Sequence, residues 1–259
     1  MKVLIFPDKA KAITRTAAAL RAAVTRKPDT VLGLATGGTM EPVYAALADK
    51  PGGCSFSRVT TFNLDEYVGL APEHPQSYRS YMRRHLFDHL DFDPAKTHLP
   101  HGAASNPEAE AGAYETLITR AGGIDLQLLG LGANGHIGFN EPGSSLGSPT
   151  RIKTLTQKTR NDNARFFGPD ETVPRYAITM GIRTITFARE ILLLAVGSAK
   201  AAAAEAMIEG PVSAFCPASA LQFHPRATIV LDEESAACLK LRDYYEVVHP
   251  QGEEIHLGQ

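Results

Sequence analysis

The sequence has few cysteines, and none lies in a pattern typical of a metal site or a disulfide framework. Its three cysteines, Cys54, Cys216 and Cys238, lack the short paired spacing of zinc ligands, and their odd number argues against a disulfide framework. His85 and His89 have helical spacing, but no carboxylate completes a zinc motif there. We therefore expect free thiols in a reducing compartment and no bound metal.

Long hydrophobic runs and a strong net charge are also absent. No uninterrupted apolar stretch approaches the ~18 residues that span a bilayer. The apolar start at residues 3–6 is followed at once by Asp8 and Lys9, unlike a signal peptide. A formal net charge of −2 gives no basic field for nucleic acid or anionic membrane. These absences predict a cytoplasmic protein that captures any anionic ligand with local positive groups.

Short apolar runs alternate with helix-like segments along the chain. The predicted strands cover residues 3–6, 31–35, 59–63, 124–129, 191–196 and 227–231. Helices are predicted after Asp8, from the 36–39 loop to about Ala48, and over 78–90, 107–120 and 198–209. This alternation is typical of an α/β fold with an open, mostly parallel, Rossmann-like sheet and helices on both faces. Without a linker or repeat, residues 1–259 are predicted to form a single domain.

One segment matches the dinucleotide-binding pattern but lacks its context. Residues 130–135 read G-x-G-x-x-G and follow a predicted strand. A helix should come next, yet residues 136–143 add two glycines and Pro142. About 20 positions on, where an acidic residue would hold a ribose, residues 151–153 are basic. The sequence therefore argues against a nucleotide cofactor.

A glycine loop between a predicted strand and helix is a candidate phosphate site. Thr36-Gly37-Gly38-Thr39 can bring backbone amides and hydroxyls to an anion at a helix N-terminus, although a simple turn capped by Thr39 has the same residues. No Gly-Lys-Ser/Thr follows, so a monophosphate fits better than a nucleotide. The candidate cationic partners of the phosphate are Arg165 and Lys200; for Lys200, a solvated surface position is the alternative.

Two carboxylates and one histidine are candidates for proton transfer. Asp65 and Glu66 follow a predicted strand and point to opposite sides, so only one is expected to face a site, while a structural ion pair remains the alternative. His136 stands among glycines, which leave room for a ligand, and its near-neutral pKa range suits proton exchange. Glu141 could orient that ring, whereas an ordinary loop histidine is the competing interpretation.

Several motifs in series resemble the glucosamine-6-phosphate deaminase family. The resemblance rests on residues 33–39 (GLATGGT), 61–67 (TFNLDEY) and 134–142 (NGHIGFNEP), with further similarity at 145–155 and 218–222. The motifs keep their order and spacing from the first strand to about Leu239. A series of this length is far more specific than any one motif.

The resemblance implies conversion of glucosamine 6-phosphate to fructose 6-phosphate and ammonia without metal or nucleotide. By analogy, His136 moves protons during opening of the sugar ring, and Asp65 carries the C2 proton to C1. Glu141 and Asn134 would support the imidazole. The phosphate would be held by Thr36, Gly37, Gly38, Thr39, Arg165 and Lys200.

The chain departs from the family pattern at two positions. Met40 stands where the family usually has proline, which removes a pre-set backbone angle from the first helical turn. Asn134 fills a position that is aspartate in some members, so Glu141 is left as the anionic partner of His136.

The resemblance also predicts assembly and regulation. Some members are hexamers activated by N-acetylglucosamine 6-phosphate, so a homo-oligomer is expected. The positions that match the effector pocket are Ser144, Arg151, Lys153 and Thr154. The segment after Leu239 aligns poorly, and activation stays an open hypothesis.

Three other functions compete with the deaminase. A galactosamine-6-phosphate isomerase or a 6-phosphogluconolactonase would share the fold, and a lactonase needs no base at C2. A non-catalytic sugar-phosphate sensor belongs to a different class. Neither a helix-turn-helix segment nor a basic face is evident in the sequence, and both proton-transfer positions are filled.

Overall fold

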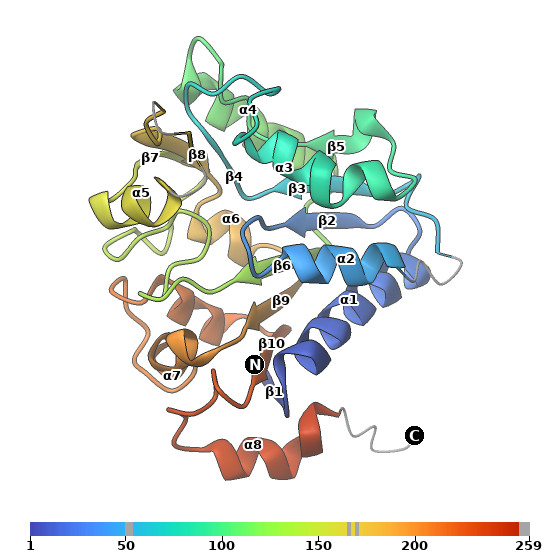
Figure 1. Cartoon of the computed structure of the whole chain (residues 1–259), viewed down its shortest axis with the longest axis vertical. Helices are drawn as coiled ribbons and strands as arrows, with labels where there is room; N and C mark the ends of the chain where they lie inside the picture. The colour runs from blue at the N-terminus through green and yellow to red at the C-terminus, as the bar shows by residue number, and fades with distance from the viewer. Residues whose placement is uncertain (50–53, 165–166, 169–170, 254–259) are drawn as a thin grey trace.

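The computed structural model describes residues 1–49, 54–164, 167–168 and 171–253, which build two sheets (Figure 1). The larger is parallel throughout. Its order is β1 (Lys2–Phe6), β10 (Ala227–Asp232), β9 (Glu190–Ala195), β6 (Leu126–Gly130), β2 (Val31–Leu34), β3 (Thr60–Asn63) and β5 (Thr97–His98). The smaller, at the upper left of Figure 1, is antiparallel with the order β4 (Asp65–Tyr67), β8 (Tyr176–Thr179) and β7 (Arg151–Thr154).

Helices cover both faces of the large sheet. The helices of the structure are α1 (Lys9–Arg26), α2 (Glu41–Asp49), α3 (Tyr78–His85), α4 (Pro107–Arg120), α5 (Gln157–Ala164), α6 (Ile182–Thr186), α7 (Ala201–Ile208) and α8 (Arg242–Val248), of which α5 lies beside the small sheet (Figure 1). On one face, Tyr114 of α4 meets the Phe62 ring edge-on at 5.7 Å. Successive side chains of a strand alternate between faces, and Leu126 and Leu192 belong to the opposite face, beneath α1. This arrangement confirms the predicted fold class.

Local sequence accounts for where the main helices begin. The Asp8 carboxylate accepts a hydrogen bond from the Lys11 backbone N–H at 2.8 Å, which caps α1. Asn106 caps α4 in the same way, and Pro107 takes the first helical position, where no N–H is needed. In the described part of the chain, no helix has the length and apolar character to cross a bilayer.

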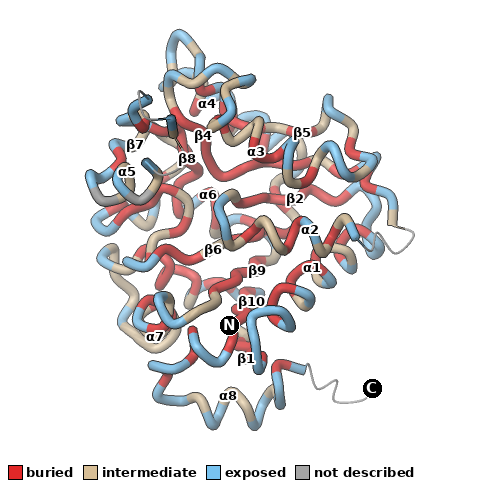
Figure 2. Tube along the Cα trace, viewed as in Figure 1, coloured by how far each residue is buried: buried red, intermediate tan, exposed pale blue. Residues whose placement is uncertain are grey.

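The central strands are apolar because both their faces are covered. Leu128, Leu193 and Ile229 are fully buried, and Figure 2 shows the strands of the large sheet as buried over most of their length. By contrast, α8 has no buried residue and mixes exposed with half-buried positions. The apolar run predicted as a strand at 191–196 therefore lies inside the large sheet, where both faces of a strand are covered.

The sequence predictions differ from the structure in several elements. Strands β5, β7 and β8 and helices α5, α6 and α8 were not predicted. Residues 65–67, which follow the predicted third strand, form β4, which pairs antiparallel with β8 in the small sheet. The helix predicted over 78–90 stops at His85, because Leu86 turns to φ −141° and a 3₁₀ turn follows at Phe87–His89. Strand β7, with no buried residue, has no apolar run from which it could be predicted.

The order of the strands reverses at one point in the sheet. From β2 the chain proceeds outward through β3 to β5, whereas from β6 it proceeds the other way through β9 to β10. The loops after β2 and β6 therefore diverge at their carboxyl ends. In open α/β sheets, this divergence is where a ligand-binding crevice forms.

Candidate active site

The Thr36–Thr39 loop lies at this point of divergence, between β2 and α2. Gly37 has φ +104°, a left-handed conformation that favours glycine, and neither Gly37 nor Gly38 has a neighbouring atom where a side chain would project. The turn is held by the Gly37 carbonyl, which accepts hydrogen bonds from the Met40 backbone N–H and the Tyr81 hydroxyl, each at 2.9 Å. The loop thus presents an open backbone to a ligand.

Met40 has a structural role that explains its departure from the family pattern. It is fully buried, and its methyl carbon lies 3.3 Å from the point where a side chain on Gly130 would begin. Its N–H closes the Gly37 turn, and proline has no N–H to donate. The methionine therefore holds the glycine loop against the carboxyl end of β6 by a contact that proline could not make.

Asp65 is a buried carboxyl group at the start of β4, opposite Thr179 of β8. A side-chain carbon built on Gly138 would lie 3.0 Å from Thr179 Oγ1 and 3.4 Å from Asp65 Oδ2. The loop that carries His136 therefore passes directly over this carboxyl group. Burial, with a smaller contribution from the charge of Glu66, raises the pKa of Asp65 to about 8. A pKa near neutrality is what a general base requires.

Glu66 is directed away from this carboxyl group and serves α3. It accepts hydrogen bonds from the backbone N–H groups of Tyr67 and Tyr78 at 2.9 Å and of Arg79 at 3.1 Å. Burial raises the pKa of Glu66, and these hydrogen bonds oppose the rise. The two adjacent carboxylates therefore point to opposite sides of the chain, as an extended backbone predicts. One faces the candidate site, and the other caps a helix.

His136 is oriented by Asn134. The Asn134 amide donates through Nδ2 to Glu141 Oε2 at 2.8 Å, which turns its Oδ1 toward His136 Nδ1, 2.6 Å away. Because Oδ1 can only accept, Nδ1 carries the proton, and the lone pair of the neutral ring is on Nε2. This tautomer makes Nε2 the nitrogen that can take a proton from a substrate.

Glu141 supports this arrangement from a buried position. Its Oε2 lies 3.8 Å from His136 Nδ1, and its side chain is 6% exposed. Its Oε1 accepts hydrogen bonds from Thr159 and, at 3.4 Å, from Thr156. The carboxylate thus reaches the ring chiefly through Asn134, and its negative charge favours an imidazolium when one forms.

The glycines near His136 serve packing rather than ligand access. A side-chain carbon on Gly132 would lie 2.3 Å from the imidazole ring. Gly135 has φ +78°, and a side chain there would meet Cys216 Sγ at 2.6 Å. The expectation that these glycines leave room for a ligand is therefore wrong for both, because the imidazole ring and Cys216 fill that space.

Lys200 follows β9 in the 3₁₀ turn Ser198–Lys200, at the same edge of the sheet. The turn begins at Gly197, whose φ is +88° and whose N–H donates to both Asp232 carboxylate oxygens at 3.0 Å. The structure thus brings the loops after β2, β3, β6 and β9 to the carboxyl edges of four adjacent strands. Arg165, the other predicted phosphate partner, lies outside the described residues.

The four positions matched to an effector pocket adjoin the His136 loop and β7. Arg151 donates through a terminal guanidinium nitrogen to Asn140 Oδ1 at 2.8 Å, and burial lowers its pKa. Ser144 is buried, and among the described residues its hydroxyl has no hydrogen-bond partner. Burial and the charge of Arg151 lower the pKa of Lys153, while Thr154 is exposed at the end of β7. Of these residues, Arg151 is tied to the loop that carries His136 through its hydrogen bond to Asn140.

Residues 9–230 match the sequence model of a family described as glucosamine-6-phosphate isomerases/6-phosphogluconolactonase. The chain belongs to this family. Among its relatives, a protein named glucosamine-6-phosphate deaminase from Hahella chejuensis is 60% identical over 87% of each chain. A protein of the same name from Rhodopirellula baltica is 56% identical over 93% of this chain and 97% of the relative.

Solved structures of the family superimpose on the chain. A monomeric glucosamine-6-phosphate deaminase has a TM-score of 0.89 with 44% identity, covering 92% of this chain and 100% of the other. The 6-phosphogluconolactonase from Trypanosoma cruzi reaches 0.75 with 19% identity, covering 92% and 97%. At that identity, the second comparison shows the common fold alone.

The sequence did not point to several residues that shape the candidate site. Tyr81 fixes the glycine loop, while Thr179 and Gly138 enclose Asp65. Gly138 lies inside a quoted motif, but its φ of +56° depends on the path of the loop. No sequence signal marks Thr179, because its place opposite Asp65 follows from the pairing of β4 with β8.

Proposed function

We propose that the chain converts glucosamine 6-phosphate and water to fructose 6-phosphate and ammonia. The observation that carries the proposal is the placement of Asp65. Its buried carboxyl, with a pKa of about 8, lies beneath the loop that carries His136, at the edge where the glycine loop opens. The relatives with 56% and 60% identity bear the name of this activity.

In this proposal, the loop after β2 anchors the phosphate. The open backbone of Gly37 and Gly38 and the hydroxyls of Thr36 and Thr39 donate to the phosphate oxygens. Lys200 supplies positive charge from the carboxyl end of β9, two strands away. Anchoring the remote phosphate fixes the position of the reacting carbons, so binding contributes to the rate through orientation.

His136 opens the sugar ring. Its Nε2 takes the proton from the hydroxyl on C1 and returns it to the ring oxygen as the bond from C1 to that oxygen breaks. The imidazolium that forms in between is favoured by Glu141 through Asn134. The product is the open-chain aldehyde, with its amino group still on C2.

Asp65 then moves a proton between carbons. Its carboxylate removes the proton from C2 as the C1 oxygen takes up a proton, which gives an enediolamine. It then delivers the C2 proton to C1 as the nitrogen loses one. The resulting ketimine adds water at C2 and releases ammonia, which leaves fructose 6-phosphate. Burial of the carboxyl group strengthens it as a base, since its raised pKa brings it close to the pH at which it acts.

A release assay distinguishes the three sugar-phosphate activities. We expect ammonia from glucosamine 6-phosphate and much less from galactosamine 6-phosphate. A 6-phosphogluconolactonase, which shares the fold and the family description, would release no ammonia and would hydrolyse 6-phosphogluconolactone. No ammonia from either amino sugar, at any pH between about 6 and 9, would refute the proposed function.

Assembly, regulation, domain organisation and location remain predictions. We expect a homo-oligomer, although one solved deaminase with 44% identity is monomeric. Sedimentation of the purified chain tests this expectation. If Ser144, Arg151, Lys153 and Thr154 bind N-acetylglucosamine 6-phosphate, a sigmoidal rate curve should become hyperbolic when it is added. We further infer that residues 1–259 act as one domain in the cytoplasm.

A further inference from the structure

The turn that carries Lys200 lies beside the end of a neighbouring strand. Strand β10 runs parallel to β9, with Leu231 opposite Ala195, the last residue of β9. Asp232 follows Leu231 and ends β10, so it lies next to the point where the chain leaves β9 for α7 (Figure 1). The carboxyl ends of two adjacent strands therefore meet at this turn.

Two hydrogen bonds in series link Asp232 to Lys200. The Gly197 N–H donates to both carboxylate oxygens of Asp232 at 3.0 Å, and the Gly197 carbonyl accepts from the Lys200 backbone N–H at 3.0 Å. Beside this link, the Ser198 N–H donates to Glu234 Oε2 at 3.2 Å. The backbone of the turn is therefore held by side chains at the end of β10 as well as by its own hydrogen bond.

Asp232 is itself fixed in place by Ser235. The aspartate is 3% exposed, its Oδ1 accepts from the Ser235 N–H at 2.9 Å, and its own N–H donates to Ser235 Oγ at 3.1 Å. The Ser235 hydroxyl donates in turn to the Ala195 carbonyl at 2.8 Å, which joins the ends of β10 and β9. A buried carboxylate is costly unless it is hydrogen-bonded, so these contacts keep Asp232 in one orientation.

We propose that Asp232 is a positioning residue that sets the affinity for the substrate phosphate through Lys200. This inference rests on the proposed function, in which Lys200 contacts the phosphate. A lysine ammonium is a point charge on a flexible stem, so the site of its charge depends on where its backbone is held. A backbone fixed before binding also lowers the entropy that is lost when the phosphate arrives.

Charge alone predicts the opposite effect from positioning. Asp232 and Glu234 are carboxylates near the sheet edge where the glycine loop opens, so their charge disfavours a bound phosphate. If charge were their only influence, neutralising either one would tighten phosphate binding. If they hold the turn, neutralising either one weakens binding, because Lys200 is no longer held in place. The sign of the change therefore distinguishes the two roles.

Two single variants test the sign. Asp232→Asn keeps the shape of the side chain but replaces one acceptor oxygen by an NH₂ group, which cannot accept from Gly197. It should raise KM for glucosamine 6-phosphate at least about threefold with little change in kcat, because Asp65 and His136 are unchanged. Glu234→Ala, at an exposed position where the fold tolerates change, should raise KM by a smaller factor. A lower or unchanged KM in Asp232→Asn would overturn the assignment.

A double-mutant cycle tests whether Asp232 acts through Lys200. In the Lys200→Ala background no ammonium is left to misplace, so adding Asp232→Asn should change KM less than about 1.5-fold. The same factor in both backgrounds would mean that Asp232 affects the phosphate by another route, and the inference would be wrong.

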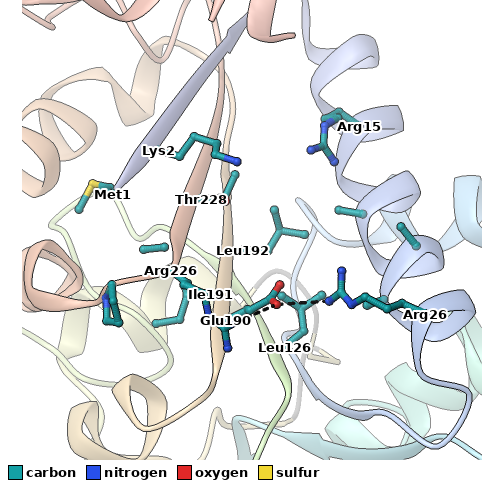
Figure 3. A pocket seen from close by; sticks show the side chains of 15 residues that line it. Met1, Lys2, Arg15, Arg26, Leu126, Glu190, Ile191, Leu192, Arg226 and Thr228 are labelled. Atoms are coloured by element: carbon teal, nitrogen blue, oxygen red, sulfur yellow. Dashed lines mark hydrogen bonds and ion pairs between the residues drawn. The ribbon is translucent and has the colours of Figure 1, made fainter. Parts of the chain in front are cut away.

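A matched control removes a carboxylate from the other end of the same strands. Glu190 begins β9, and its Oε1 lies 3.3 Å from Arg26 and 3.6 Å from Arg226 at the amino ends of β9 and β10 (Figure 3). Glu190→Gln removes one negative charge and loosens contacts between neighbouring elements, as Asp232→Asn does, but far from the turn. It should leave KM unchanged. An equal rise in KM would mean that general loosening of the sheet, and not the turn, affects binding.

Titration calorimetry with fructose 6-phosphate separates this inference from the proposed function, because binding needs no turnover. Asp232→Asn should weaken the binding of fructose 6-phosphate by the same factor by which it raises KM. If the chain released no ammonia but Asp232→Asn still weakened this binding, the deaminase proposal would fail and the role of Asp232 would stand. If ammonia were released and the affinity of Asp232→Asn were unchanged, only the role of Asp232 would fail.

Discussion

Replacement of Asp65 by asparagine should remove activity and, at neutral pH, stabilise the fold. The pKa of this carboxyl rises from 3.8 to about 8 because the fold buries it. Between these values, the folded chain keeps the Asp65 proton while the unfolded chain releases it. The folded state then binds more protons than the unfolded state, so its stability falls as pH rises through this window and levels off above about 8.

The size of the effect follows from the shift. For each rise of one pH unit inside this window, the free energy of unfolding of the unchanged chain falls by about 1.4 kcal/mol relative to that of Asp65→Asn, whose amide does not titrate. Between pH 5 and pH 7, the stability difference should therefore move by about 3 kcal/mol in favour of the variant. The sign of this change follows from the direction of the pKa shift.

Urea unfolding of both proteins at several pH values between 5 and 9 measures the difference directly. Asp91→Asn is the control, because hydrogen bonds from Ser55 and the Phe56 N–H lower the pKa of Asp91. That carboxyl is ionised in both the folded and the unfolded state above pH 5. The stability difference between Asp91→Asn and the unchanged chain should therefore not change with pH. A difference for Asp65→Asn that also stays constant from pH 5 to pH 8 would refute the reasoning, whatever the activity.

Further outcomes follow from the same geometry. The kcat/KM of the unchanged chain should rise with pH and level off near 8, as the Asp65 base ionises; a profile flat from 6 to 9 would contradict that role. Tyr81→Phe removes the hydroxyl that donates to Gly37, and should raise KM about two- to tenfold with little change in kcat. His136→Gln should impair the closed-ring substrate more than the open-chain form, and equal losses would remove it from ring opening. Lys200→Ala should chiefly weaken the affinity for phosphorylated sugar, measured by competition with inorganic phosphate.

Local patterns predicted six of the seven strands of the large sheet; the two-residue strand β5 (Thr97–His98) was not predicted. The central strands of this sheet are apolar because they are covered on both faces. Asp8 marks the start of α1, because its carboxylate accepts a hydrogen bond from the backbone N–H of Lys11, three residues further along the chain. The position of Asp65 and Glu66 after a strand was also evident from the sequence. Their opposite directions followed from the extended backbone alone.

The partners of the candidate site residues could not be predicted in this way. Glu66 accepts a hydrogen bond at the start of α3 only because β4 lies beside that helix. In the same way, the Tyr81 hydroxyl donates to Gly37 only because α3 lies beside the glycine loop.

The sequence by itself determined the fold class, the family and the residue types available for proton transfer, since these depend on periodicity and on motifs read along the chain. Only the tertiary structure decided which groups are buried together. Asp65 acquires its raised pKa from burial among β4, β8 and the loop over it, three segments that are far apart in the sequence. Burial is a property of that assembly, and no local pattern contains it.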